Sequence, residues 1–119
     1  MKICIIGSSG HYRYALEGMQ GKEDIKLLGI AKGSEGERME GIEKAATGIN
    51  PCVKQYENYR TMMDELCTDV VVINSHFSDH ARITVEALER GIHVFVEKPV
   101  ATTYEDLEIV EKAYCKSGV

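Results

Sequence analysis

The sequence lacks several features that mark particular classes of protein. Only two of its 119 residues are proline and 44% are hydrophobic, a composition typical of folded rather than disordered chains. Its 14 lysines and arginines are outnumbered by 19 aspartates and glutamates, giving a net charge of −5 and no basic stripe to attract a phosphate backbone. Nucleic acid is therefore not an expected partner.

Paired cysteines and long apolar runs are also missing. No two of the four cysteines form a C-x-x-C pair, which disfavours both a zinc ribbon and a redox dithiol. The apolar run at the N-terminus is too short for a signal peptide, and no run approaches the roughly 20 residues of a membrane span. We therefore expect reduced thiols, no membrane association and a cytoplasmic location.

Apolar, β-rich runs alternate with segments of helical spacing along the whole chain. Strands are expected over residues 2–6, 25–31, 52–55, 69–73 and 92–96. This alternation produces parallel βαβ units with right-handed crossovers. The prediction is a three-layer α/β fold with a doubly wound, Rossmann-like parallel sheet of strand order 3-2-1-4-5, forming a single domain over residues 1–119.

Helices are expected after each strand, including a weak one over residues 37–47 and another over 79–90 that Ser78 or Asp79 would cap. The last helix should begin at a capping box formed by Thr103 and Asp106. Two apolar stripes indicate buried helix faces. They are Tyr59, Met62, Met63 and Leu66 in the third helix, and Leu107, Val110 and Tyr114 in the last.

The first strand runs into a glycine-rich loop. The loop reads Gly7-Ser8-Ser9-Gly10-His11-Tyr12. A dinucleotide fingerprint G-x-G-x-x-G would place glycines at positions 7, 9 and 12, and only Gly7 fits. Ser9 is small enough for close backbone approach, and loop amides with a helix N-terminus can bind phosphate. A plain turn that needs glycine for its backbone angles is an equally weighted alternative.

The second strand ends in Lys32, where a dinucleotide domain usually has an acid that binds the adenosine ribose. Lys32, with Ser34 nearby, would suit the 2′-phosphate of NADP, because the acid that would repel this dianion is gone. The alternative is a solvated loop lysine. The expected cofactor is NAD or NADP, with a slight preference for NADP.

Polar side chains also follow the fourth and fifth strands, at the expected ligand crevice. Asn74, Ser75, His76 and His80 follow the fourth strand, and Glu97, Lys98 and Pro99 follow the fifth. The two histidines are four residues apart across a loop without a third ligand, so no metal site is expected. The alternative for the second group is a strand end with a surface ion pair.

Together, DVVVI over residues 69–73, His80 after a polar loop, and ALERGIHVFVEKP over residues 87–99 resemble the glucose-fructose oxidoreductase/inositol dehydrogenase/MocA (Gfo/Idh/MocA) family. The resemblance implies an NAD(P)-binding domain of an oxidoreductase acting on a sugar, polyol or related substrate. It gives Lys98 a catalytic place near the nicotinamide ribose and substrate hydroxyl, with Glu97 and Pro99 shaping the turn, and places His80 along the cofactor.

The family's proton-transferring residue lies in a C-terminal substrate domain that this chain does not contain, so the chain is not expected to catalyse a reaction alone. Departures at Ser9, Tyr12 and Lys32 support a second interpretation, a degenerate domain with a non-catalytic nucleotide-binding, regulatory or interaction role. An unpaired strand edge over residues 92–96 suggests a possible homo-oligomer.

Overall fold

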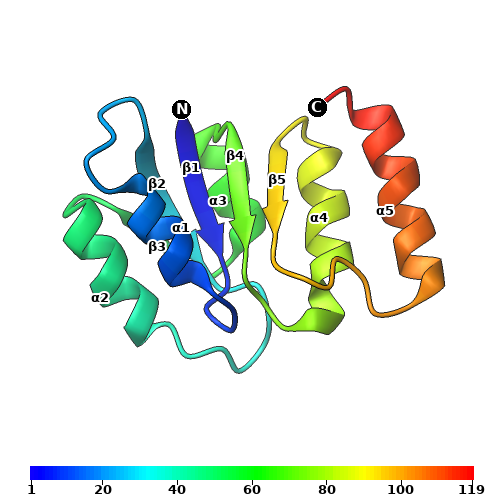
Figure 1. Cartoon of the computed structure of the whole chain (residues 1–119), viewed down its shortest axis with the longest axis horizontal. Coiled ribbons are helices and arrows are strands. Elements are labelled where there is room, and N and C mark those ends of the chain that lie inside the picture. Colours follow the sequence, from blue (N-terminus) through cyan, green and yellow to red (C-terminus); the bar gives the residue numbers. More distant parts are fainter.

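The computed structural model describes all 119 residues, and its centre is a five-stranded parallel sheet (Figure 1). The strands are β1 (Lys2–Ile6), β2 (Lys26–Ala31), β3 (Lys54–Tyr56), β4 (Val70–Ile73) and β5 (His93–Val96). Their order is β3-β2-β1-β4-β5, and every neighbouring pair is parallel. The predicted Rossmann-like topology is therefore confirmed.

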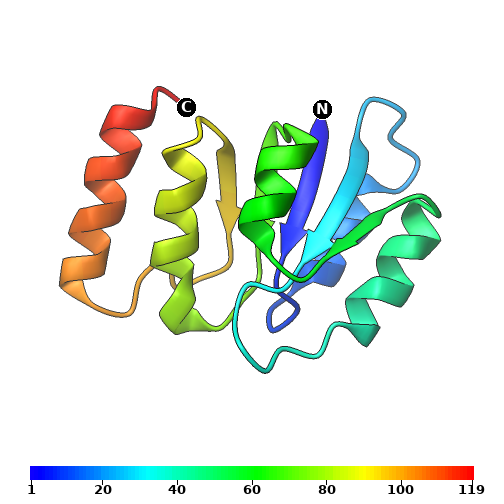
Figure 2. The ribbon, with the colours of Figure 1, turned by 180° about the vertical axis from the view of Figure 1, so that it is seen from behind.

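Helices cover both faces of the sheet, as seen from the front and from behind (Figures 1 and 2). They are α1 (Tyr12–Met19), α2 (Glu40–Ile49), α3 (Tyr59–Leu66), α4 (His80–Leu88) and α5 (Tyr104–Ser117), with a short 3₁₀ turn, η1 (Phe77–Asp79), before α4. Alternate strand residues enter two separate apolar clusters, one beneath α1 and α2 and the other beneath α3 and α4. All parallel strands point their carboxyl ends toward one edge, where the polar loops gather.

Two elements start two or more residues later than expected. The third strand spans residues 54–56 rather than 52–55, and the second helix starts at Glu40 rather than at residue 37. The later helix start has a physical cause, because the carboxylate of Glu37 is drawn toward the ends of β1 and β2 by hydrogen bonds from backbone amides. No helix is long and apolar enough to cross a membrane.

The last helix begins as predicted but does not bury the predicted face. Thr103 caps α5: its Oγ1 accepts from the Asp106 backbone N–H at 3.1 Å and donates to Asp106 Oδ2 at 2.9 Å. Leu107 and Tyr114, however, are 45% and 60% exposed, and Val110 is only half-buried. The reason is that α5 packs beside α4 and not on the sheet, so most of its apolar stripe has no partner (Figure 1).

Candidate functional site

The strand ends converge on Ser75, which is 1% exposed. Gly7, at the end of β1, has a φ of +86°, and a Cβ there would lie 2.6 Å from the Cα of Ser75. Gly33, after β2, has no room for a side chain either, because a Cβ there would lie 2.9 Å from Ile6 Cγ2 and even closer to the Ser75 hydroxyl. The ends of β1, β2 and β4 therefore meet at van der Waals distance only because two of these positions are glycine.

Backbone hydrogen bonds fix the glycine-rich loop. The Gly7 amide donates to the Ala31 carbonyl at 2.8 Å, and the amides of Ser9 and Gly10 both donate to the Asn74 carbonyl, at 2.7 and 3.1 Å. These three donors therefore hold the loop against β2 and β4. They leave the start of α1 as the place where the loop can receive an external anion.

No side chain caps the N-terminus of α1. His11 is the N-cap residue and makes no side-chain capping hydrogen bond, and the first turn has no acidic residue. Tyr12, which stands where the fingerprint has its last glycine, is buried between α1 and α2, and a Cβ at Gly41 would lie 2.9 Å from the Tyr12 hydroxyl. Tyr12 is thus a core residue that Gly41 accommodates.

Asn74 supplies an unpaired hydrogen-bond donor at the junction of β1 and β4. The residue is 3% exposed, and its side-chain Nδ2 has no hydrogen-bond partner. A Cβ at Gly10 would lie 3.0 Å from Asn74 Oδ1 and 3.2 Å from Glu97 Cγ, so three strand ends meet around this amide. Buried polar groups in folded proteins are rarely left without a partner, and this one suits a ligand that brings an acceptor.

Glu37 is a site residue that the sequence did not reveal. It is 7% exposed, and four donors converge on its carboxylate. Oε1 accepts from the Ser8 amide at 3.1 Å and the Ser9 hydroxyl at 2.8 Å, and Oε2 accepts from the amides of Gly33 and Ser34 at 2.9 and 3.0 Å. The only sequence signal is an acid a few residues beyond β2, which is indistinguishable from a surface glutamate.

Lys32 and Ser34 are both engaged with protein groups. Lys32 Nζ lies 2.8 Å from Glu57 Oε2, and this hydrogen bond and the charge of Glu57 raise the pKa of Lys32. The Ser34 hydroxyl donates to Asp79 at 2.6 Å and accepts from the His76 amide at 3.1 Å. Lys32 and Ser34 nevertheless line one surface pocket, together with Arg60 and Arg82.

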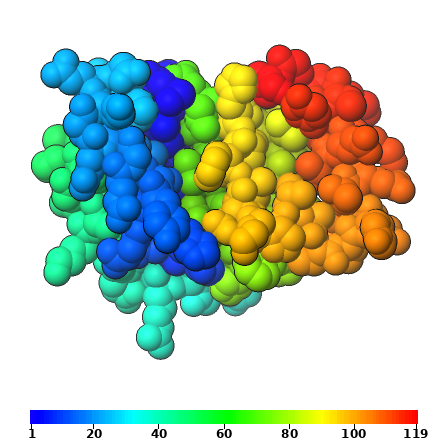
Figure 3. Space-filling view, viewed as in Figure 1, coloured from blue at the N-terminus to red at the C-terminus, as the bar shows by residue number.

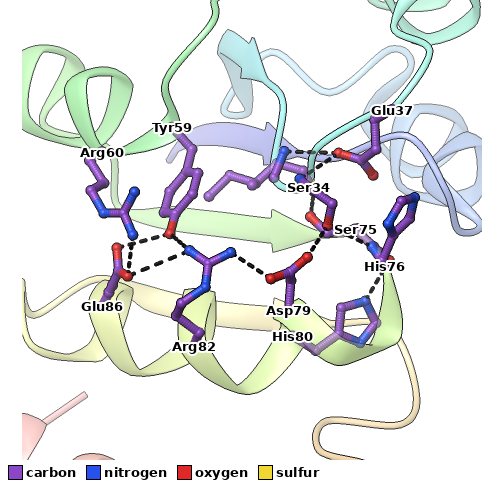
Figure 4. A network of polar contacts seen from close by, with 12 residues as sticks. Ser34, Glu37, Tyr59, Arg60, Ser75, His76, Asp79, His80, Arg82 and Glu86 are labelled. Carbon is purple, nitrogen blue, oxygen red and sulfur yellow. Dashed lines mark hydrogen bonds and ion pairs between the residues drawn. The ribbon is translucent and has the colours of Figure 1, made fainter.

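A polar network continues from Ser34 along α4 to α3 (Figure 4). Arg82 donates to Asp79 at 2.6 Å and also to the Tyr59 hydroxyl, which in turn donates to Glu86 at 3.0 Å. Burial raises the pKa of Asp79, but hydrogen bonds from Ser34 and Arg82 outweigh it and hold that pKa below its usual value. Burial and the bond to Glu86 raise the pKa of Tyr59 to about 12.

Neither Ser78 nor Asp79 caps the following helix as predicted. Asp79 occupies the N-cap position of α4 but makes no side-chain capping hydrogen bond there. The physical reason is that its carboxylate instead accepts from Ser34 and Arg82, while the 3₁₀ turn η1 precedes the helix. Asp79 therefore links the β2 and β4 loops.

His80 is fully buried and joins two loops of the site. Its Nδ1 lies 2.8 Å from the Pro99 carbonyl and its Nε2 lies 2.9 Å from the Ser75 carbonyl. His76 is exposed, so the two histidines do not face a common point, and the chain has no cluster of three or more side chains able to hold a metal ion. His80 positions the turn that follows β5.

The segment after β5 places one half-buried and one exposed charge at the crevice. The Glu97 side chain is 17% exposed, and its Oε2 lies 3.4 Å from His11 Nδ1 at the start of α1. The Lys98 side chain is 86% exposed and its Nζ lies 4.0 Å from Glu97 Oε1. Pro99 follows a cis peptide bond. Glu97 thus connects β5 to the glycine-rich loop, and Lys98 is free to meet a ligand.

A doubly wound sheet, a glycine turn, an uncapped helix N-terminus and an unpaired buried amide at the β1/β4 junction define a dinucleotide-binding domain of the Rossmann class. The model of the Gfo/Idh/MocA family, described as "Oxidoreductase family, NAD-binding Rossmann fold", matches residues 1–119. The chain belongs to this family and comprises its NAD-binding domain.

Several known proteins are similar to the chain. Inositol 2-dehydrogenase of Salmonella typhimurium is 30% identical over 116 residues, covering 98% of this chain and 32% of the relative. A solved structure from Thermotoga maritima, named as an oxidoreductase without a stated substrate, is 49% identical with a TM-score of 0.90, covering 98% of this chain and 35% of that one. The chain therefore spans about a third of the length of these relatives.

Two more distant structures share the fold. The WlbA dehydrogenase from Chromobacterium violaceum, solved with NADH and UDP-GlcNAcA, is 22% identical with a TM-score of 0.80, covering 98% of this chain and 32% of that one. Biliverdin reductase from Synechocystis, solved with biliverdin and NADP⁺, is 22% identical with a TM-score of 0.79, covering 98% of this chain and 35% of that one. NAD and NADP forms of the cofactor thus both occur among structures of this fold.

Proposed function

We propose that this chain binds NAD(H) or NADP(H) at the carboxyl ends of β1 and β4, as part of an enzyme that oxidises or reduces a sugar, polyol or related alcohol or carbonyl substrate. The observation that carries the proposal is the buried, unpaired Asn74 amide beside the uncapped start of α1. Similarity to an inositol dehydrogenase supports a polyhydroxylated substrate.

Each candidate side chain has a defined task in this proposal. The glycine-rich loop over residues 7–12 and the first turn of α1 receive the phosphates, and Asn74 donates a hydrogen bond to the cofactor. Ser75 and His80 hold the loops beneath it, and His76 lies at the rim. The bound dinucleotide supplies a nicotinamide ring that gives or takes a hydride. Lys98, exposed beside Glu97, orients the substrate hydroxyl or carbonyl oxygen.

Two matched asparagine variants test the cofactor site. Asn74→Ala is expected to weaken dinucleotide binding about tenfold, because it removes one hydrogen bond of roughly 1 to 1.5 kcal/mol. The variant should have nearly unchanged stability, because the Asn74 amide is unpaired in the free protein. Asn50→Ala should lower the stability of the protein and leave dinucleotide affinity unchanged. Asn50 Nδ2 donates to the Leu27 carbonyl at 2.8 Å, far from the crevice. Calorimetric titration and urea unfolding measure both properties.

The two variants separate a binding role from a structural one. A loss of stability without a loss of affinity in Asn74→Ala would reassign that amide to the fold. Failure of the unmodified protein to bind any of NAD, NADH, NADP and NADPH would instead support the degenerate, non-catalytic interpretation of the domain.

Turnover in this proposal requires a second domain that supplies the proton-transferring residue and closes over the substrate, with residues 1–119 forming the single cofactor-binding domain. We place the enzyme in the cytoplasm, which is consistent with four free cysteines, three of them exposed. Small molecules, rather than nucleic acid or membranes, are the proposed partners.

Self-association is a second proposed property, supported by the edge strand β5. β5 pairs only with β4, and Phe95 on it is 65% exposed. In the space-filling view, the yellow-orange β5 region reaches the surface between the blue N-terminal helix and the orange-red C-terminal segment (Figure 3). Sedimentation at rising concentration should reveal an oligomer that Phe95→Lys weakens. Strictly monomeric sedimentation at high concentration would refute this property.

A further inference from the structure

We propose that Glu37 is a specificity-determining residue that makes the site select NAD(H) over NADP(H). The inference rests on the proposed dinucleotide function and names the part of the ligand that is discriminated, the adenosine ribose with or without its 2′-phosphate. It reverses the preference that Lys32 suggested from the sequence alone.

The Glu37 carboxylate fills a ready-made anion cradle. The backbone amides of Ser8, Gly33 and Ser34 all point at it, and they come from the two loops that follow β1 and β2. Convergent backbone N–H groups of this kind bind anions such as phosphate. In this protein the anion is one of the chain's own carboxylates, 7% exposed.

All hydrogen-bond acceptor positions of the Glu37 carboxylate are occupied. Its two oxygens offer about four lone-pair positions, and the three amides and the Ser9 hydroxyl make four hydrogen bonds to it. A 2′-phosphate placed at the ends of β1 and β2 would find these donors occupied and a negative charge among them. Because the cradle is nearly buried, water screens that repulsion poorly.

A ribose hydroxyl meets a different environment. Unlike a phosphate, it can donate a hydrogen bond to the carboxylate, and the donor it would replace is the rotatable hydroxyl of Ser9, 2.8 Å from Oε1. The three backbone amides can then stay on Glu37. A free 2′-hydroxyl can therefore bind Glu37 once the Ser9 hydroxyl has rotated away.

The surrounding network holds the cradle in place. Ser34, which donates its amide to Glu37, is fixed by its hydroxyl contacts with Asp79 and the His76 amide (Figure 4). Of the two cations next to the cradle in sequence, Lys32 is drawn to Glu57 at 2.8 Å, and Arg38 is exposed. Neither Ser34 nor Lys32 therefore neutralises the Glu37 carboxylate.

Calorimetric titrations of the protein with NAD⁺ and NADP⁺, and with the fragments 5′-AMP and adenosine 2′,5′-bisphosphate, test the inference without any turnover. The unmodified protein should bind NAD⁺ at least tenfold more tightly than NADP⁺. Glu37→Gln should narrow that ratio at least tenfold, and the fragment pair should shift in the same direction. Glu35→Gln, which removes the same charge from an exposed position in the same loop, should leave the ratio unchanged.

Each outcome bears on a different claim. Tighter binding of NADP⁺ by the unmodified protein, or an unchanged ratio in a folded Glu37→Gln variant, would overturn the role of Glu37 while leaving dinucleotide binding intact. Glu37→Asp, which keeps the charge, covers the case in which the glutamine variant does not fold, and it should still prefer NAD⁺. Absence of binding by every dinucleotide would overturn the proposed function and this inference together.

Discussion

Replacing Gly7 with alanine is expected to destabilise the protein by about 2 to 5 kcal/mol and to abolish dinucleotide binding. Two penalties add: the φ of +86° is unfavourable for a residue with a Cβ, and that Cβ would lie 2.6 Å from both the Cα and the backbone nitrogen of Ser75. Backbone atoms cannot rotate away as a side chain can. The β1 and β4 ends must therefore separate at the point where the loop is formed.

Urea unfolding monitored by circular dichroism measures the stability change, and Gly48→Ala is the matched control. Gly48 lies in α2 with no atom within 4 Å of an added Cβ, so the same substitution there should stabilise the protein by about 0.5 to 1 kcal/mol. Equal midpoints for Gly7→Ala and the unmodified protein would show that β1 and β4 do not approach so closely.

Replacing Lys98 with alanine in the complete enzyme is expected to lower kcat by about 10²- to 10³-fold, the usual cost of removing a positioned hydrogen-bond donor from the reacting oxygen. Stability and cofactor affinity should change little, because the Lys98 side chain is 86% exposed and its one ionic contact is at 4.0 Å from Glu97. The fold does not depend on this side chain, which is consistent with a role toward a ligand.

Steady-state kinetics with a polyol substrate and NAD⁺ or NADP⁺ measure the effect, and Lys22→Ala provides a control at an exposed lysine outside the crevice. Lys98→Arg, which keeps the charge with a different geometry, should recover part of the rate. A kcat for Lys98→Ala within twofold of the unmodified enzyme would remove Lys98 from the reaction.

The sheet was predictable because its signals are local. The run over residues 69–73 is apolar on both sheet faces, as an interior parallel strand requires, and it became β4 between β1 and β5. The stripe of Tyr59, Met62 and Met63 likewise identified the buried face of α3. In both cases the pattern that specifies the element also specifies what covers it.

The site was less predictable because its key contacts join residues distant in sequence. Glu37 reaches back 29 residues to the Ser8 amide, and no periodicity marks an acid in a loop as the centre of four hydrogen bonds. The stripe of Leu107 and Tyr114 shows the complementary difficulty, because helical spacing identifies an apolar face without saying whether anything packs on it. The local sequence pattern specifies the helices and strands, whereas tertiary contacts determine which residues pack against each of their faces.

The arrangement of α5 also divides the molecule into parts of unequal local stability. None of its residues is buried, and its contacts are mainly with α4 rather than with the sheet. The two apolar clusters that hold the sheet contain no residue of α5. The helix can therefore open without disturbing either cluster, so its amides should exchange with solvent through local opening, well below the free energy of global unfolding.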